Sequence, residues 1–429
     1  MRTRFTWVLA VAALVSAGIM LACSTNYSSS SNGLVVVSTQ TDYVMDSFSL
    51  TLGNGHISQI YNQQGPPTNG IPTAVVLDPA GANAYVVVTK STYVNDSSTG
   101  VESFPVNSDG KLGSGTTTVL HTLTYTPPNT SLAEAVPVMP ASVAIDSSGK
   151  LLFVADSQTS DSSGNSVPGA ISVLSVGSNG ALTEISGSPF LLSELPGSTT
   201  TTLTAIPSAS ALAVTPTVFP ASYSACSGNV PPTTENLYVT DSNNYVVLNY
   251  SVSSAGALKL ISENATGKVP SGVTVDPCNR FVFVSNGQPD NTISAFTICS
   301  SVNLPTCTLG DYSLIPVGGS PFPAGGNAPG PLMMDAYANF LYVLDTGQSS
   351  ISVFKVGTTT GALTVSTPAT VATSSFPTSM AIRSDDSWMF VTNLNSSTLS
   401  EYSITPATGV LTPQTPLQTD PLPWGVAVK

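Results

Sequence analysis

Charged side chains are scarce in this sequence and unevenly balanced. Asp, Glu, Lys and Arg make up 8% of its 429 residues, with 11 basic against 24 acidic side chains and a formal net charge of −13. Such an acidic chain is a poor partner for nucleic acid or an anionic membrane surface. The shortage of charge also leaves few residues for the polar faces of long helices, so we expect an all-β protein with many turns.

Histidine is also nearly absent, because His56 and His121 are the only two in the chain. No G-x-S-x-G, H-E-x-x-H or Walker sequence occurs, so the usual signatures of serine hydrolases, zinc proteases and nucleotide-binding proteins are missing. We therefore predict no cofactor and no metal. Calcium bound by the loops at 161–165 or 289–291 is an alternative, although these loops offer fewer oxygen ligands than calcium usually takes.

The longest apolar run lies at the start of the chain. It extends from residue 5 to 21 and follows Arg2 and Arg4, which is the layout of a secretory signal. The run is too short, and too abruptly followed by polar residues, to favour a transmembrane helix. We interpret residues 1–22 as a signal peptide, so the protein is expected to be exported.

Cys23 directly follows this run and a small residue, Ala22. The arrangement resembles the bacterial lipobox, in which the cysteine is lipidated and becomes the new N-terminus. Residues 23–33 are rich in Ser and Asn and are predicted to form a flexible tether. Ser24 after the cysteine favours the outer membrane, and signal cleavage without lipidation is the alternative.

Four further cysteines follow in the rest of the chain, an even number that suits disulfides in an exported protein. They have no C-x-x-C spacing and no nearby histidine, which makes a metal site the weaker interpretation. The four are Cys226, Cys278, Cys299 and Cys307.

A repeated phrase dominates the remaining sequence. Each copy begins with Pro, alternates apolar residues in the manner of a strand, and ends six residues after the Pro, usually in Asp. An aromatic residue of a second strand follows this end at a constant distance of seven residues in five copies. The copies span 72–78, 140–146, 270–276, 329–335, 377–383 and 423–429, and the aromatics are Tyr85, Phe153, Phe283, Tyr342 and Phe390.

Several second strands end in Asp or Asn, and we interpret these residues as turn-formers rather than catalytic acids. A third alternating strand and a Gly-x-Leu turn with a fourth strand complete each unit. Four short antiparallel strands in a repeated unit are the content of one blade of a β-propeller. The residues at the ends of the second strands are Asp156, Asn286, Asp345 and Asn393.

One unit, at 209–264, carries an insertion of about sixteen residues between its first two strands, and Cys226 lies in it. Cys278 lies in the same turn of the next unit. Because these turns are neighbours in a ring, the register predicts a bridge between Cys226 and Cys278. The remaining two cysteines, Cys299 and Cys307, are then predicted to form a second disulfide that clamps a hairpin within one unit.

The strands left over at the two ends complement each other. Residues 33–62 match strands two to four, and residues 423–429 match strand one. Pairing them predicts a seven-bladed propeller in which the C-terminal strand closes the ring, so residues 34–429 are expected to form a single domain. Six or eight blades remain alternatives if the inserted unit is interpreted differently.

The phrase Pro-x-x-φ-x-φ-Asp, followed by aromatic-Val-x-Asp/Asn and Ile-Ser-x-Phe strands, resembles the YVTN-type repeat of lactonase-family seven-bladed propellers. The family includes 6-phosphogluconolactonase-like proteins, so the resemblance implies this fold and a lactone-hydrolysing activity. Enzymes of this fold usually draw catalytic groups from His, Arg and Glu near the central channel. Here His56 and His121 fall at peripheral positions, and Arg383 and Lys429 are the basic residues that end innermost strands.

These observations favour a binding or scaffold module over an enzyme. The strands expected to line the channel carry Pro, Ser, Thr, Val and Met, whereas the loops are rich in Ser, Thr, Asn and Tyr. We therefore predict a monomeric, lipid-anchored propeller of the cell envelope that binds a protein or a glycan. A lactonase acting on a sugar or aromatic lactone is the alternative.

Overall fold

The computed structural model consists of strands, turns and loops, with no α-helix among the residues it describes. No helix in that part of the chain could cross a membrane. The predicted signal peptide, Cys23, most of the tether and Cys307 lie outside it. The described residues are 32–51, 56–60, 64–90, 99–126, 132–192, 205–216, 226, 235–299 and 310–429.

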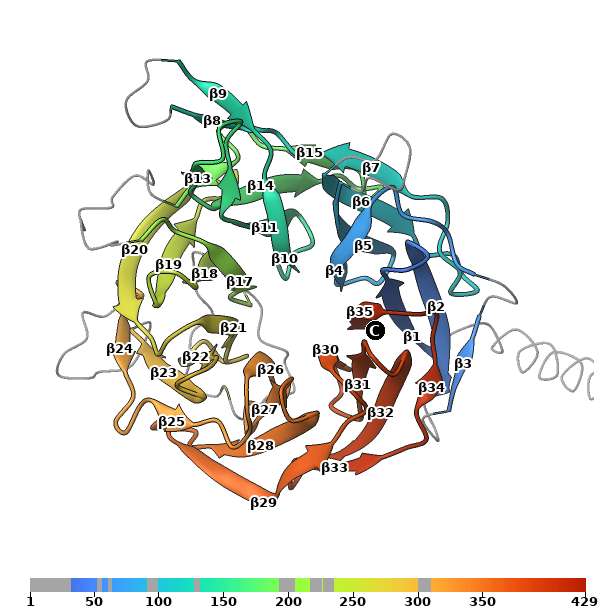
Figure 1. Cartoon of the computed structure of the whole chain (residues 1–429). Coiled ribbons are helices and arrows are strands. Elements are labelled where there is room, and N and C mark those ends of the chain that lie inside the picture. The colour runs from blue at the N-terminus through green and yellow to red at the C-terminus, as the bar shows by residue number, and fades with distance from the viewer. Residues whose placement is uncertain are drawn as a thin grey trace, which may run out of the picture.

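Seven sheets are arranged as blades around a central axis (Figure 1). Each blade has four antiparallel strands, which are named below in order from the innermost to the outermost. Blade 1 is β4 (Ile71–Leu77), β5 (Asn83–Thr89), β6 (Gly100–Pro105) and β7 (Thr116–Val119). Blade 2 is β10 (Met139–Ile145), β11 (Leu151–Ser157), β14 (Ala170–Val176) and β15 (Leu182–Glu184). Blade 3 is β17 (Ala209–Val214), β18 (Glu235–Asp241), β19 (Val246–Val252) and β20 (Leu258–Ala265).

The remaining four blades follow the same order. Blade 4 is β21 (Pro270–Val275), β22 (Phe281–Asn286), β23 (Thr292–Ile298) and β24 (Leu314–Pro316). Blade 5 is β26 (Pro329–Met334), β27 (Phe340–Asp345), β28 (Ser350–Val356) and β29 (Leu363–Ala372). Blade 6 is β30 (Pro377–Ile382), β31 (Trp388–Asn393), β32 (Thr398–Thr405) and β33 (Val410–Pro413). Blade 7 is β35 (Pro423–Val428), β1 (Asn32–Thr39), β2 (Val44–Thr51) and β3 (Ile57–Gln59).

Blade 7 confirms the predicted closure, because its innermost strand comes from the C-terminal end of the chain and its other three from the N-terminal part. β35 pairs with β1 antiparallel, with Val426 opposite Val37 and Val428 opposite Val35. The backbone N–H of Lys429 donates to the carbonyl of Leu34 at 2.9 Å. The ring is therefore closed by ordinary strand pairing.

The second strand of each blade is the centre of the core. Its alternating side chains are buried on both faces because each blade packs between two others. The repeated aromatics predicted from the sequence all lie here with no exposed surface. They are Tyr85, Phe153, Phe283, Tyr342 and Phe390, and the inserted unit adds Tyr238 at the same place.

The prediction that Asp156, Asn286, Asp345 and Asn393 act through turn chemistry was wrong for their main contacts. All four side chains are completely buried. Each side chain forms a hydrogen bond with a serine hydroxyl of the third strand. In the register of the two strands, this serine lies opposite the second-strand residue that is two positions before the Asp or Asn. The bonds join Asp156 to Ser172 (2.7 Å), Asn286 to Ser294 (3.0 Å), Asp345 to Ser352 (2.6 Å) and Asn393 to Ser400 (2.9 Å).

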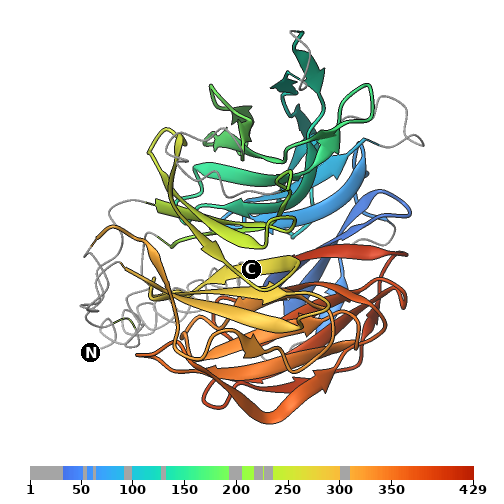
Figure 2. The ribbon, with the colours of Figure 1, turned by 60° about the vertical axis from the view of Figure 1, so that its left-hand side comes forward.

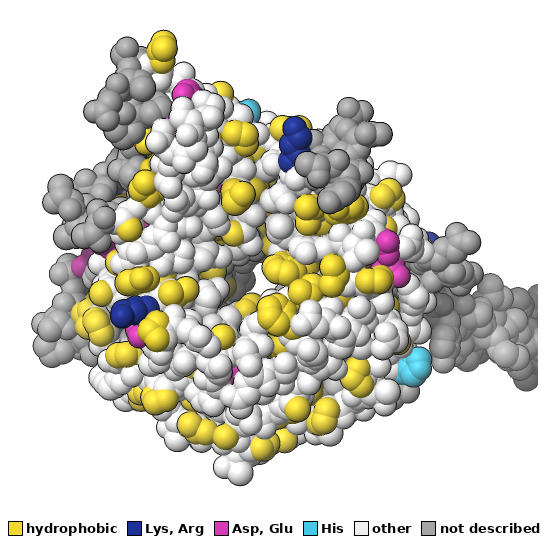
Figure 3. All heavy atoms as spheres, in the orientation of Figure 1, with side chains coloured by type: hydrophobic (Ala, Val, Ile, Leu, Met, Phe, Trp, Pro, Cys, Tyr) yellow, Lys and Arg dark blue, Asp and Glu magenta, His cyan; other side chains and the backbone are white. Residues whose placement is uncertain are grey.

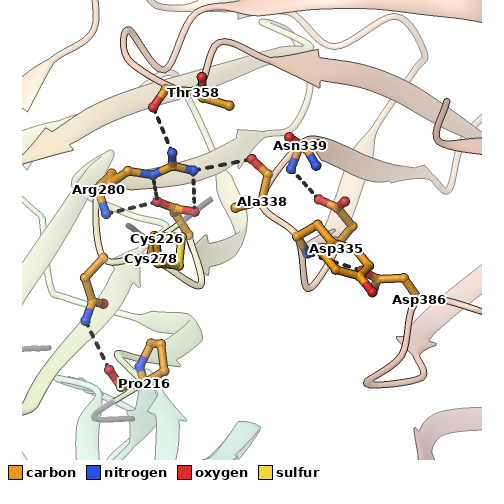
Figure 4. Close-up of a disulfide and its surroundings, with 12 residues drawn as sticks. Pro216, Cys226, Cys278, Arg280, Asp335, Ala338, Asn339, Thr358 and Asp386 are labelled. Carbon is orange, nitrogen blue, oxygen red and sulfur yellow. Dashed lines mark hydrogen bonds and ion pairs between the residues drawn. A yellow bond between two sulfur atoms is a disulfide. The ribbon is translucent and has the colours of Figure 1, made fainter. Parts of the chain in front are cut away.

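The structure contains the disulfide that the register predicted between Cys226 and Cys278 (Figure 4). It joins the insertion of blade 3 to the first turn of blade 4, with a Cα–Cα distance of 5.1 Å. Beside it, Arg280 is buried and forms an ion pair with Asp276 at 2.6 Å. Its Nη1 also donates to the carbonyl of Thr358 at 2.8 Å, which ties blade 4 to blade 5. Cys299 is disulfide-bonded as well, whereas its predicted partner lies outside the described residues.

Short elements at the rim were not predicted. β16 (Phe190–Leu191), β25 (Phe322–Pro323) and β34 (Leu417–Gln418) each pair with a third strand beside the fourth. A hairpin of β8 (Leu123–Tyr125) and β9 (Glu134–Val136) projects from the ring (Figure 2). A smaller one is formed by β12 (Thr159–Ser160) and β13 (Ser166–Val167).

Candidate functional site

A channel runs along the axis of the ring, and its wall is made by the innermost strands of all seven blades. The cavity has a volume of about 720 Å³, within the range of small-molecule sites. All innermost strands run in the same direction, so the channel has two different ends. We call the end where they begin, mostly with Pro, the proline face. The end where they turn into the second strands is the turn face.

The middle of the channel wall is apolar. Each innermost strand places an aliphatic or thioether side chain at the third position after its opening residue. These side chains are Val75, Val143, Leu212, Val273, Leu332, Met380 and Val426, and all seven line the cavity.

Several hydroxyl groups of the wall are committed to holding the blades together. Ser210, Ser271 and Thr378 follow the opening residue of their strands, and each hydroxyl donates to the first carbonyl of the next innermost strand. The acceptors are Pro270 (2.8 Å), Pro329 (2.7 Å) and Pro423 (3.3 Å). Other side chains make the same bond at further joints: Gln40 to Pro72 (2.9 Å), Ser157 to Ala209 (3.0 Å) and Thr346 to Pro377 (3.2 Å).

Ionisable groups reach the described channel wall only at the turn face, where Asp78 ends β4 and Lys429 follows β35. The carboxylate of Asp78 accepts from the N–H of Ala82 and the amide of Asn83, both at 2.8 Å. The Lys429 ammonium donates to the carbonyl of Ala80. The aliphatic part of Lys429 lies over Gly81, where a Cβ would be 2.1 Å from its Cδ. The residue at 81 must therefore be small for the lysine to keep this position.

Comparison with known proteins gives the architecture a family context. The family model "Lactonase, 7-bladed beta-propeller" matches residues 301–423. No curated protein sequence gives a significant match. The Pseudomonas aeruginosa periplasmic gluconolactonase superposes with a TM-score of 0.65 at 16% identity, covering 93% of this chain and 99% of that one. The fold is that of the lactonase-type propellers.

Two further solved propellers are similar over the same share of this chain, 93%. A Lactobacillus plantarum protein has a TM-score of 0.65 at 17% identity and is covered over 99% of its length. A Bacteroides fragilis protein, provisionally named as a 6-phosphogluconolactonase, has a TM-score of 0.63 at 16% identity and is covered over 98%. At these identities the likeness to both proteins concerns the fold.

The two histidines lie away from the channel wall. His56 is exposed next to the outermost strand of blade 7. His121 lies just after β7. Its Nδ1 is 3.3 Å from the carboxylate of Glu184 in blade 2. Neither histidine is placed to act on a molecule in the channel.

The two basic residues that end innermost strands are not brought together as one anion site. Lys429 lines the channel, whereas Arg383 is not part of the lining. Arg383 forms an ion pair with Asp385, and its Nη1 also donates to Ser387 at 3.2 Å. The repeat register therefore places both at strand ends, but local pairing in the turn decides which one faces the channel.

Within the described part of the chain, no group of three or more acidic, histidine or cysteine side chains is placed to hold a metal ion. The loop at 161–165 is closed on itself instead. Asp161 accepts from the N–H groups of Ser163 and Asn165 at 2.9 and 2.8 Å and from the side-chain amide of Asn165 at 2.9 Å. The carboxylate stabilises a tight turn.

Sequence reasoning did not single out Asp78. It is one of several Asp residues at the same place in the repeat, and the sequence gives no sign that it alone borders the cavity. Its counterpart Asp146 is 5% exposed and accepts from the N–H groups of Lys150 (2.6 Å) and Leu151 (2.9 Å). The difference lies in the neighbouring blade, because only Asp78 has Lys429 of the closing strand beside its turn.

Proposed function

We propose that this protein is a lactone hydrolase that holds a small lactone in the central channel and opens the ring with water. The observation that carries the proposal is an open channel in a lactonase-type propeller with one carboxylate and one ammonium at the same end of its described wall. Lactone hydrolysis needs a base for the attacking water and a positive group for the developing oxyanion. This assignment replaces the protein or glycan scaffold as the leading function.

The reaction follows from these two side chains. Asp78 takes a proton from water as the water oxygen attacks the lactone carbonyl. Lys429 stabilises the negative charge on the carbonyl oxygen of the tetrahedral intermediate. The ring C–O bond then breaks, and the proton passes from Asp78 to the leaving alkoxide. The product is a hydroxy acid, which releases one proton into solution near neutral pH.

Proton release from a panel of lactones by the purified protein tests this proposal. Asp78→Asn is expected to lower kcat by about 100-fold or more, because it removes the base. Lys429→Met is expected to lower kcat by about 100-fold through loss of charge stabilisation. Asp146→Asn is the matched control, since Asp146 occupies the same turn position but does not line the channel. Equal losses in Asp78→Asn and Asp146→Asn would show a role in folding instead.

A binding module without turnover is the second candidate. The observation that favours it is the wall itself, where hydroxyls such as Ser210 and Ser271 are committed to the joints between blades. Saturable binding of a lactone with no proton release, from protein with a cooperative melting transition, would support binding and overturn the hydrolase.

Export and lipid anchoring complete the proposal. The buried Cys226–Cys278 disulfide fits an oxidising compartment such as the periplasm. We propose that Cys23 carries the lipid and that residues 24–33 space the propeller from an outer membrane. Mass spectrometry of the N-terminal peptide should show a diacylglyceryl-modified Cys23, and Cys23→Ser should release the protein in soluble form. An unmodified N-terminus generated by ordinary signal cleavage would contradict the anchor.

A further inference from the structure

Exposed apolar side chains lie at or just before the start of the innermost strands of four blades at the proline face. Met139, Val269, Phe376 and Leu422 are 52%, 42%, 41% and 39% exposed, and each directly precedes a proline in the opening turn of an innermost strand. These strands pack side by side around the axis, so their first residues border one opening. Figure 3 shows hydrophobic side chains around the central opening and few charged ones near it. We call these four residues the apolar mouth.

The backbone of the apolar mouth is strained in three of its four members. Val269, Phe376 and Leu422 have φ angles of 52°, 57° and 56°, a region that L-residues with large side chains rarely adopt. The conformation is held because their carbonyls accept from the N–H groups of Gly287 (2.9 Å), Leu394 (2.9 Å) and Gln40 (3.0 Å), respectively.

Glycine would relieve this strain, yet the chain keeps large apolar side chains in these positions and exposes them. Exposure of a single apolar residue is ordinary. Exposure of large apolar side chains repeated beside one opening is typical of a functional surface.

The apolar mouth continues into an apolar channel. A strand of six residues extends about 20 Å, so the wall is long enough for an extended chain. Ser210, Ser271 and Thr378 already donate their hydroxyls to neighbouring blades. These three hydroxyls are therefore not free to bind a ligand, and the side chains in the middle of the wall are aliphatic or thioether groups. An apolar part of a ligand is suited to this segment, because burying a polar group without a hydrogen bond costs free energy.

The described wall also offers only one cation, Lys429, and it lies at the turn face. A phosphorylated lactone needs positive partners for its phosphate in addition to one for the reacting carbonyl. A single ammonium does not supply both. The net charge of −13 disfavours a dianionic ligand further.

We infer that the ligands of this site are uncharged lactones that carry an unbranched apolar chain. The lactone ring lies at the turn face beside Asp78 and Lys429. The chain extends along the apolar wall towards Phe376 and Leu422 at the proline face. This inference rests on the proposed function for the position of the ring, and on the wall and the apolar mouth for the chain.

A series of γ-lactones with alkyl chains of increasing length tests the inference. Dissociation constants are measured by calorimetry, and kcat/KM by proton release. We expect affinity to rise about threefold to fourfold with each added methylene until the channel is filled. The unsubstituted ring and 6-phosphogluconolactone should bind much more weakly than the longest chains.

Variants of the wall and the apolar mouth give a second readout. Phe376→Ser and Leu422→Ser should weaken binding of the longest lactone about 5- to 10-fold and leave that of the shortest unchanged. Val119→Ser and Val365→Ser are matched controls, because these exposed side chains lie on the outermost strands β7 and β29. Ser379→Phe, which fills the channel wall, should abolish binding of long chains, with an unchanged melting temperature as evidence of folding.

The outcomes separate the inference from the proposed function. Binding that depends on chain length, without any turnover, would uphold the ligand class and overturn the hydrolase. Turnover with no dependence on chain length, or with preference for 6-phosphogluconolactone, would overturn the ligand class alone. No binding and no turnover with any lactone, from folded protein, would overturn both.

Discussion

Asp46 is a carboxyl group that the fold buries completely, in β2 of the closing blade. Its Oδ1 accepts a long bond of 3.4 Å from the N–H of Gly65, and its Oδ2 has no partner among the described residues. Burial, followed by the nearby charge of Asp420, raises the pKa of Asp46 to about 6. Ionisation of this group therefore works against the folded state.

This raised pKa predicts that Asp46 destabilises the protein at neutral and alkaline pH. The folded chain binds more protons than the unfolded chain between pH 4 and 6, so stability falls as the pH rises through this window. Asp46→Asn should raise the free energy of unfolding by roughly 2 kcal/mol at pH 8 and change it little at pH 4. Urea denaturation at the two pH values measures the difference.

Asp42→Asn is the matched control, because Asp42 lies nearby but is exposed. It should change stability much less at both pH values. An Asp46→Asn variant with the same effect at pH 4 and pH 8 would contradict the role of ionisation.

The sequence could not reveal this group as a buried carboxyl. The register places Asp46 opposite Val37, at the position that Ser172, Ser294 and Ser352 occupy in other blades. The repeat pattern predicts a serine there, not a carboxyl group. The neighbour that matters, Asp420, lies at the other end of the chain and becomes a neighbour only through ring closure.

At the scale of elements, the strands were predictable where local spacing is constant. In five of the seven blades the first two strands are joined by a short turn of fixed length, so Pro and the aromatic recur at fixed distances. The connections around the proline face vary in length and composition. Elements such as β8, β12 and β34 arise from these connections, and their pairing depends on contacts that no repeat specifies.

The disulfide between the insertion of blade 3 and the first turn of blade 4 links two elements, and we predict its effect on the free energy of unfolding. The bridge links Cys226 and Cys278 across 52 positions of the chain, and both residues are buried. A cross-link of this span restricts the unfolded chain. The Cys226→Ser/Cys278→Ser double variant should lose about 2–4 kcal/mol of unfolding free energy in guanidinium titrations.

The two single variants control this experiment. Each breaks the same bond, so each should cost nearly as much as the double variant, and the two effects should not add. Additive losses would mean that the thiols stabilise by packing rather than by the covalent bond. Cys299 is unchanged throughout, which keeps its own disulfide out of the comparison.

For the whole molecule, the sequence predicts the ring because the leftover strands at the two ends complete one blade. It does not predict how the blades are fastened to one another. That fastening depends on hydroxyls, such as those of Ser271 and Thr378, that reach the carbonyl of the next blade. The candidate site could not be predicted from the sequence either, since the groups that border the channel become neighbours only when β35 completes the wall.

Closure by β35 predicts that the ring is stable only as a whole. β35 pairs with β1 and packs against the innermost strands of blades 1 and 6, so its removal exposes three surfaces at once. A chain ending at Leu422 leaves the edge of β1 unpaired beside Val35 and Val37, which favours aggregation. We expect this truncated chain to lack the cooperative melting transition of the full protein.

A peptide of residues 423–429 should restore that transition when it is added in trans, because strand addition supplies both the backbone hydrogen bonds and the buried Val426. A scrambled peptide of the same composition should not. Trp424, which lines the channel, reports on docking through its fluorescence. If the truncated chain melts like the full protein without the peptide, the seventh blade is not what closes the ring.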